Sequence, residues 1–327
     1  MIFLKSIDPT YFEYCADIHL CNIKKDDPDD KVSQNASIAL RAEYSKALET
    51  LFALLFSLIQ APYCPFAWIN EYSNQELYDL VNKLCEYKPI LTLWEKPMFT
   101  WQSLSNLVFS WLVIEDKEKE LKIKEGFSQL WSRFASQFSD KTFIDEYNSI
   151  KHGFRAHAGG FWIATGKENE PGVPASPENM RLMGTSKFGT SFLVSEKIGQ
   201  LRQHIQVTSV HRNWNPEDLA WGLHLAAMSI SNVQTALQII NGTPADKIQY
   251  HYPSDIATFH EPWKRSAQIG ITSIKGFQVE ILPEFIEPFT KKEILKAFME
   301  GKDVGGRRLN ITEKPINKKL RETKKSS

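Results

Sequence analysis

The chain has 327 residues, of which 42% are hydrophobic, 24% are charged and 12% are aromatic. This apolar content can bury a sizeable core, which excludes wholesale disorder. The 39 Lys and Arg residues balance the 39 Asp and Glu residues. The chain therefore has no overall field that would draw it to nucleic acid or to an acidic membrane, and any such attraction must come from local patches.

The sequence shows no targeting or membrane pattern. The N-terminus lacks the basic, apolar and small-residue regions of a secretion signal. The longest apolar run, 51–59, is far shorter than the ~20 residues that a membrane-spanning helix needs. The four cysteines form no CxxC pair and are too few for a disulfide scaffold in a chain of this size. We therefore expect a cytoplasmic protein with reduced thiols and no membrane partner.

Familiar cofactor motifs are also missing. The sequence holds no Walker loop, no GxGxxG, no GxSxG, no HExxH and no EF-hand pattern. Cys15, His19 and Cys21 lie close together in the sequence, but a fourth ligand for a metal ion is missing. We expect no cofactor and no bound metal.

The first long helix is predicted from near Ala36 to just before Pro62. Apolar residues step by four and three along it and draw one stripe, and a second stripe lies beside the first. A helix that is apolar on more than one side is buried, so we expect this helix at the centre of a bundle. The two stripes comprise Tyr44, Leu48, Leu51, Leu55 and Leu58, and Phe52, Phe56 and Ile59.

Apolar spacing predicts four further helices, at 75–86, 100–113, 117–138 and 141–157. The last of them begins after Asp140 as its N-cap. Its apolar residues Phe143, Tyr147, Ile150 and Phe154 step by four, three and four. Tryptophans occur at helical spacing or at helix starts, and we expect them in the core; they are Trp94, Trp101, Trp111, Trp131, Trp214 and Trp221.

The pattern changes after Gly159-Gly160. Two strand-like runs, FWIAT and FGTSFLV, flank a loop rich in Pro, Gly and Asn, and we interpret residues 158–195 as a small β insertion. A helix is then expected at 196–205, followed by a long helix at 216–240 with Asn215 as its N-cap and Pro216 in its first turn. Two short strands, IGITSI and FQVEI, and a short helix after Thr290 complete the predicted elements.

From Gly306 the chain is polar and basic, with eight Lys or Arg residues against two Glu, which leaves six net positive charges. We predict a disordered basic tail over 301–327. The fold class is mostly α, of the α+β type: a helical bundle with a small inserted β element and short C-terminal strands. The expected parts are an N-terminal segment (1–35), a single mostly helical domain (36–300, with later helices in 196–300) and the tail.

The strongest candidate for chemistry lies late in the last helix of the bundle. Asn148, His152 and Arg155 are spaced by four and three and so share one helix face, with Lys151 beside them. An imidazole can move a proton near neutral pH, whereas Lys and Arg can stabilise the charge on phosphate oxygens. Gly153 leaves room for a substrate or a second subunit. The patch therefore suits a phosphodiester.

The motif Asn148-x-x-Lys151-His152-Gly153, late in an apolar-striped helix, resembles the HEPN superfamily over residues 36–157. The resemblance implies a helical bundle that forms a homodimer through the motif-bearing helix, with a role in bacterial stress or phage defence. Many members cleave RNA without a metal, and others have lost catalysis and only bind. The resemblance also implies that His152 is the acid/base and that Asn148 positions it or the phosphate.

Catalytic members of that superfamily carry an Arg followed, after four to six residues, by a His, and none of the eight histidines here has that spacing. Two function classes remain: a protein that dimerises and binds RNA or protein, and a metal-independent ribonuclease with His152 as acid/base and with Arg155, Lys151 and Asn148 handling phosphate. Lys151-His152-Gly153 is also the pattern of an ordinary helix C-terminus, where cations offset the helix dipole and Gly takes the left-handed position.

Overall fold

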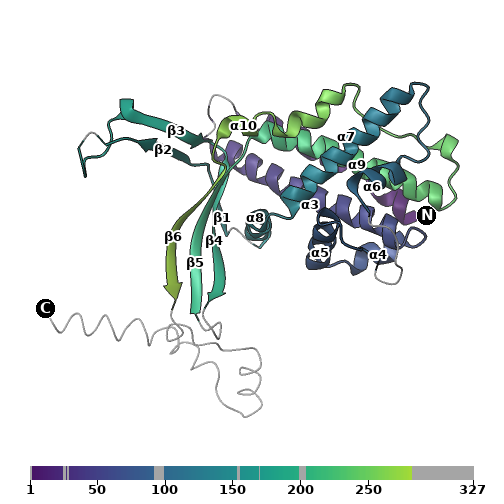
Figure 1. Cartoon of the computed structure of the whole chain (residues 1–327), viewed down its shortest axis with the longest axis horizontal. Coiled ribbons are helices and arrows are strands. Elements are labelled where there is room, and N and C mark those ends of the chain that lie inside the picture. Colours follow the sequence, from purple (N-terminus) through teal and green to yellow (C-terminus); the bar gives the residue numbers. More distant parts are fainter. Residues whose placement is uncertain are drawn as a thin grey trace, which may run out of the picture. The chain divides into compact units, whose positions relative to one another are not determined.

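A computed structural model describes the chain in the ranges 2–24, 27, 29–91, 99–152, 155–168, 170–198 and 204–281 (Figure 1). The predicted helix after Thr290 and the predicted basic tail at 301–327 lie outside the described residues. The contacts divide the chain into two units, Met1–Leu193 with Val210–Lys275, and Val194–Ser209 with Gly276–Ser327. The fold class is mostly helical with small β-sheets, as predicted.

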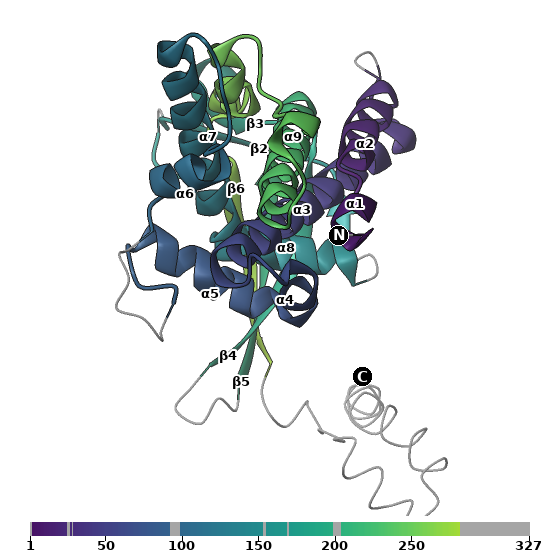
Figure 2. The same cartoon turned by 90° about the vertical axis from the view of Figure 1, so that its right-hand side faces the viewer.

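Two long helices, α3 (Lys31–Gln60) and α9 (Pro216–Ile240), form the centre of the first unit, where they lie side by side (Figure 1 and Figure 2). Both are buried along most of their length. Helix α3 begins five residues before the predicted Ala36, because its first turn carries no apolar stripe. That turn is nevertheless anchored, since the buried Ser33 hydroxyl accepts a hydrogen bond from the backbone N–H of Lys24 at 3.0 Å.

The N-terminal residues contribute to the same core. Helix α1 spans Ile2–Ser6, and α2 (Thr10–Cys21) packs against both α3 and α9. Phe12 and Ala16 of α2 are buried. Helix α2 is thus held by the central helix pair.

Helices α5 (Asn74–Cys85) and α7 (Lys117–Phe138) lie at their predicted positions, and α6 (Trp101–Val108) begins where the sequence predicts. A further short helix, α4 (Pro65–Glu71), was not predicted. A capping box fixes the start of α5, where the Ser73 hydroxyl accepts from the N–H of Glu76 and the Glu76 carboxylate accepts from the N–H of Ser73. Helix α6 ends five residues before the predicted Val113, because Phe109 leaves the helix as its C-cap and is fully buried.

Most of the tryptophans take the expected core positions. Trp131 and Trp214 are buried, and Trp101 and Trp111 pack against the core while partly exposed. The prediction is wrong for Trp221, which is 39% exposed because it lies on the outer side of α9. Trp94 lies outside the described residues.

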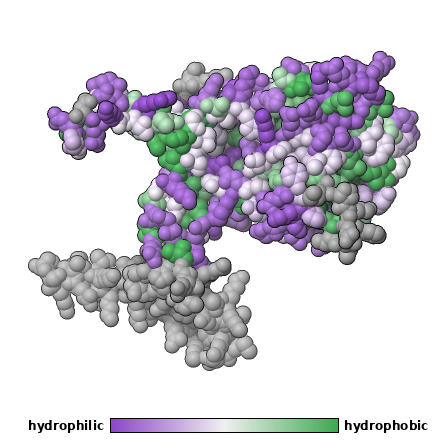
Figure 3. Space-filling view, in the orientation of Figure 1, coloured by the Kyte–Doolittle hydropathy of each residue, from purple (hydrophilic) through white to green (hydrophobic). Residues whose placement is uncertain are grey.

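The strands form two sheets. Strands β2 (Trp162–Gly166) and β3 (Met180–Thr185) pair antiparallel as a hairpin. The second sheet has the order β1-β4-β5-β6, and its strands are Ala156–Ala158, Gly189–Ile198, His204–Asn213 and Ser273–Ile281. The runs FWIAT and FGTSFLV are strands as predicted, although each pairs with other segments and not with the other run. The hairpin exposes large apolar side chains, with Trp162 at 71% and Leu182 at 55%. Its free end is mainly hydrophilic (Figure 3).

Two predictions in the second half of the chain are wrong. The helix expected at 196–205 does not form, since β4 continues to Ile198 and β5 begins at His204. The alternating run HIQVTSV favours a strand over a helix, and pairing within the sheet satisfies its backbone. The run FQVEI is a strand as predicted, within β6. The separate strand expected at IGITSI is wrong, because that run spans the end of α10 (Ser266–Ile269), a turn at Gly270 with φ of 78° and the start of β6.

The start of α9 is confirmed in detail. The Asn215 side-chain oxygen accepts hydrogen bonds from the backbone N–H groups of Glu217 at 2.8 Å and Asp218 at 3.3 Å. Pro216 takes the first turn, where no N–H donor is needed. The helix ends at Ile240, before Asn241 and Gly242, as the sequence predicts.

In the second unit, the described residues lie on the strands β4, β5 and β6. The Gln278 amide donates a hydrogen bond to the Thr208 hydroxyl at 3.3 Å, which joins β5 and β6. Phe277 and Val279 of β6 are exposed. Across the described part of the chain, the helices are too short or too polar to cross a membrane.

Candidate functional site

Helix α8 (Lys141–Lys151) carries most of the residues singled out from the sequence. Its start is as predicted, because the Asp140 carboxylate accepts a hydrogen bond from the N–H of Thr142 at 2.9 Å. The end of the helix differs from the prediction. The predicted helix continues to 157, but α8 stops at Lys151, and His152 is its C-cap. A glycine follows His152 in the sequence, and β1 begins at Ala156.

The structure separates Arg155 from the predicted helix face. Asn148 is partly buried on α8, and Lys151 and His152 are exposed at the helix end. Arg155 is exposed and lies one residue before β1, so its helical spacing from Asn148 and His152 does not apply. Gly153 lies outside the described residues. Among the residues that the structure describes, no hydrogen bond or ion pair joins the side chains of Asn148, Lys151, His152 and Arg155.

The end of α8 reaches back to α3 through aromatic and acidic side chains. The Lys151 ammonium group lies 5.5 Å from the centre of the Tyr147 ring. The Tyr147 hydroxyl donates a hydrogen bond to Glu49 on α3 at 3.2 Å. Burial raises the pKa of the Glu49 carboxyl above its usual value, while the charge of Lys151 and the hydrogen bond from Tyr147 oppose that rise.

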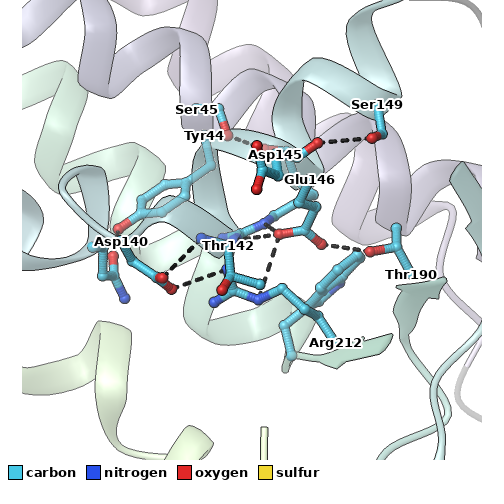
Figure 4. Close-up of polar contacts among 12 residues, drawn as sticks. Tyr44, Ser45, Asp140, Thr142, Asp145, Glu146, Ser149, Thr190 and Arg212 are labelled. Atoms are coloured by element: carbon cyan, nitrogen blue, oxygen red, sulfur yellow. Dashed lines mark hydrogen bonds and ion pairs between the residues drawn. The ribbon is translucent and has the colours of Figure 1, made fainter. Parts of the chain in front are cut away.

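A buried ion pair holds the middle of α8 against α3 (Figure 4). Glu146 is fully buried, and its Oε2 accepts from Arg41 Nη2 at 2.7 Å and from Arg41 Nε at 3.0 Å. Its Oε1 accepts from the hydroxyl of Thr190 on β4 at 2.6 Å. The Arg41 guanidinium also lies 4.2 Å from the centre of the Phe143 ring. Both carboxylate oxygens of Glu146 are thus satisfied inside the core.

A second arginine extends this cluster to β5. Arg212 Nε lies 3.7 Å from Glu146 Oε2, and Arg212 Nη1 donates to Asp140 Oδ2 at 3.2 Å (Figure 4). Burial lowers the pKa of the Arg212 guanidinium, and the charge of Glu146 opposes that effect. We call Arg41, Asp140, Glu146, Thr190 and Arg212 the Glu146 cluster. Because it joins α8 to α3, β4 and β5, it fixes the place at which α8 presents its C-terminal end.

Two further histidines lie on the sheet, one on β1, which follows α8 in the chain, and one on β5, and the sequence analysis did not single them out. His157 on β1 lies opposite Ser191 on β4 in the strand register, so the two side chains share one face of the sheet. The Ser191 hydroxyl is hydrogen-bonded to Nδ1 of His211 on β5 at 2.6 Å. His157 is exposed. These contacts depend on strand pairing, which has no signal in the local sequence.

We call the exposed residues Lys151, His152, Arg155 and His157 the α8–β1 surface. It offers two permanent cations, Lys151 and Arg155, and the imidazole side chains of His152 and His157. Among the described residues, no group of three or more His, Cys, Asp or Glu side chains is placed to hold a metal ion. The four cysteines are free thiols. The cationic side chains of the α8–β1 surface can bind an anion, and imidazole side chains can transfer protons.

Comparison with protein-family models, with curated proteins and with solved structures finds no match to this chain. The HEPN resemblance accordingly depends on the motif at 148–153 and on the order of the helices, and it stays a prediction.

Proposed function

We propose that this is an HEPN-like protein that binds RNA through the α8–β1 surface. The observation that carries the proposal is the exposure of Lys151, His152, Arg155 and His157 within one short stretch of chain. The Glu146 cluster holds the helix that precedes this stretch. Lys and Arg provide the contacts to phosphate that dominate the affinity of proteins for nucleic acid.

Binding is better supported than catalysis. A general acid or base needs its imidazole oriented by a hydrogen bond from a neighbouring group. In the described part of the chain, the His152 side chain makes no such bond, and its backbone N–H is used to cap α8 through the carbonyl of Asn148 at 3.0 Å. The metal-independent ribonuclease, with His152 as acid/base, therefore remains the alternative.

The first expected result concerns RNA affinity. The double variant Lys151→Ala/Arg155→Ala is expected to bind a fluorescein-labelled single-stranded RNA of 12 nucleotides about tenfold more weakly than the wild type, because two phosphate contacts are lost. Fluorescence anisotropy at low salt measures this. The matched control is Arg181→Ala/Lys247→Ala, which removes the same charge from exposed residues of β3 and of the turn after α9. The control is expected to retain wild-type affinity.

Two outcomes would contradict the proposal. If the wild type binds no RNA at low salt, the α8–β1 surface is not an RNA site, and a search for a protein partner becomes the next step. If both double variants weaken binding equally, the attraction is not specific to this surface. The same RNA is also incubated with the wild type and with His152→Ala in the presence of a chelator, and the products are separated on a gel. Cleavage by the wild type that is lost in His152→Ala would establish the ribonuclease.

The homodimer is a separate proposal that the resemblance implies. Light scattering of the full chain is expected to give a mass of about 75 kDa, twice the 37.6 kDa of one chain. The protein is measured at concentrations well above those of the RNA titration. If its mass there is that of one chain, the dimer proposal fails, and RNA binding does not require a dimer.

A further inference from the structure

A cavity of about 480 Å³ opens beside the α8–β1 surface, between α3, α5 and α8. Glu49 of α3, Asn74 and Tyr78 of α5, and Phe143, Tyr147 and Asn148 of α8 line it. We call it the Glu49 pocket. Its volume lies within the range of small-ligand sites. Asn148 and Tyr147 lie within one turn of Lys151, so the pocket is next to the residues that we assign to phosphate.

The walls of the Glu49 pocket suit a flat aromatic ligand. Tyr78, Phe143 and Tyr147 contribute aromatic rings. Proteins that bind single-stranded RNA commonly insert an unstacked base between such rings and read the polar edge of the base by hydrogen bonds. Glu49 lines the same pocket, as do Asp145, Lys141 and several uncharged polar residues, and its carboxylate accepts a hydrogen bond from the Tyr147 hydroxyl.

Glu49 has unused capacity to accept hydrogen bonds. A carboxylate offers about four acceptor positions. The Tyr147 hydroxyl fills one of them at 3.2 Å, and the Asn74 side chain also interacts with Glu49. Two positions are left for a ligand. Glu49 is only partly exposed, and burial raises the pKa of its carboxyl. Hydrogen bonds to a partly buried group are stronger than hydrogen bonds in water.

The charges around the Glu49 pocket are mixed. Lys141 and Asp145 both line it and lie 3.6 Å apart as an ion pair, and the positive charge of Lys151 acts on Glu49. A ligand with a neutral base and an anionic phosphate fits Lys151 and the Glu49 carboxylate together. Among the RNA bases, guanine presents two adjacent N–H donors on its Watson–Crick edge, which match the two oxygens of a carboxylate.

We propose that the Glu49 pocket takes a guanine base of bound RNA, with N1–H and the N2 amino group donating to Glu49 and the neighbouring phosphate held by Lys151. This inference rests on the proposed RNA-binding function, since it assigns a base preference to the same site.

The test compares two labelled RNAs of nine nucleotides, both oligouridine, with either guanine or adenine at the centre. The wild type is expected to bind the guanine RNA about tenfold more tightly, which is the discrimination typical of a bidentate pair. Glu49→Gln replaces one acceptor oxygen by a donor amino group in a side chain of the same size. The variant is expected to bind the guanine RNA about tenfold more weakly than the wild type, and it is expected to show no preference for guanine over adenine. The control Glu125→Gln, at an exposed carboxylate of α7, is expected to keep the preference. Thermal melting checks that both variants fold.

The outcomes separate this inference from the proposed function. If the wild type binds both RNAs equally, the guanine site is wrong and the phosphate surface stands. If Glu49→Gln keeps the guanine preference, the pocket is not the site that reads the base. If neither RNA binds, the proposed function fails, and guanosine alone is titrated by calorimetry: binding that Glu49→Gln abolishes supports the pocket, and no binding overturns it.

Discussion

Glu146→Gln is expected to lower the free energy of unfolding by about 3–5 kcal/mol, the usual cost of breaking a buried ion pair by removing one partner. Glutamine has the size of glutamate, so packing is retained while the charge is lost. In the wild type, the Arg41 guanidinium lies 2.7 Å from the Glu146 carboxylate, and the Arg41 side chain is only 6% exposed. In the variant, this buried cation has no anion in that place. Arg212 keeps its contact with Asp140 at 3.2 Å, so the main loss falls on Arg41.

Urea denaturation followed by circular dichroism measures this difference. The control is Glu118→Gln, which removes the same charge from an ion pair with Lys122 at 2.6 Å. Because both side chains of that pair are more than half exposed, the control is expected to change stability by less than ~1 kcal/mol. Equal losses in the two variants would show that the Glu146 cluster does not hold α8.

Trp131→Ala is expected to have an effect of similar size, about 3–5 kcal/mol. Trp131 is fully buried in α7, with the rings of Phe127 and Phe109 at centroid distances of 5.8 Å and 6.3 Å. Its indole N–H donates to the Ser229 hydroxyl on α9 at 3.0 Å. Removal of the indole leaves a large cavity in the core and takes away the hydrogen bond that joins α7 to α9.

The matched control for this substitution is Trp221→Ala on α9, where the side chain is 39% exposed. It removes the same atoms from the surface of the bundle, so we expect a loss well below that of Trp131→Ala. The two midpoints of urea unfolding are compared directly. A loss at Trp221 equal to that at Trp131 would contradict the assignment of Trp131 as the core residue.

Helices with strong local signals were predictable from the sequence. The predicted boundaries of α7 match Lys117–Phe138, and α9 begins at its predicted N-cap and ends before Asn241-Gly242. In both cases the apolar period and the capping residue lie within the same short window of sequence. Such elements are specified by neighbours along the chain, which explains why a sequence analysis finds them.

The strands were harder to predict because their partners are distant in the chain. Strand β1 pairs with β4, and β2 pairs with β3, and no local pattern distinguishes these pairings from the alternative of β2 with β4. The run at 196–205 was interpreted as a helix although it contains the end of β4 and the start of β5. A short segment with few apolar residues fits both the helical spacing and the alternating spacing of a strand. Tertiary pairing decides between the two structures.

The Glu146 cluster had a weak signal in the sequence. Glu146 lies on the same helix face as Phe143 and Tyr147, and Arg41 lies three residues before Tyr44 of the apolar stripe of α3. A charged residue on an apolar stripe needs a partner when it is buried. The sequence indicates that each residue needs a partner, but it does not indicate that the two are partners across 105 positions.

The candidate site was predicted in part. Lys151 and His152 do lie together at a helix end, and His152 takes the C-cap position that the simple helix-terminus interpretation requires. Arg155 was placed on the wrong face, because the helix ends before it. The contribution of His157 follows from the register of β1 on β4, which only the folded sheet defines.

The claim that Lys151 and Arg155 contact RNA phosphates is tested most directly by the salt dependence of binding. Affinity for the labelled 12-nucleotide RNA is measured at a series of KCl concentrations for the wild type and for Lys151→Ala/Arg155→Ala. The logarithm of the affinity falls linearly with the logarithm of the salt concentration, with a slope of about 0.7 per phosphate contact on a single strand. The loss of two contacts is therefore expected to make the slope of the variant shallower by about 1.4. Parallel lines for the two proteins would contradict the assignment of these residues to phosphate.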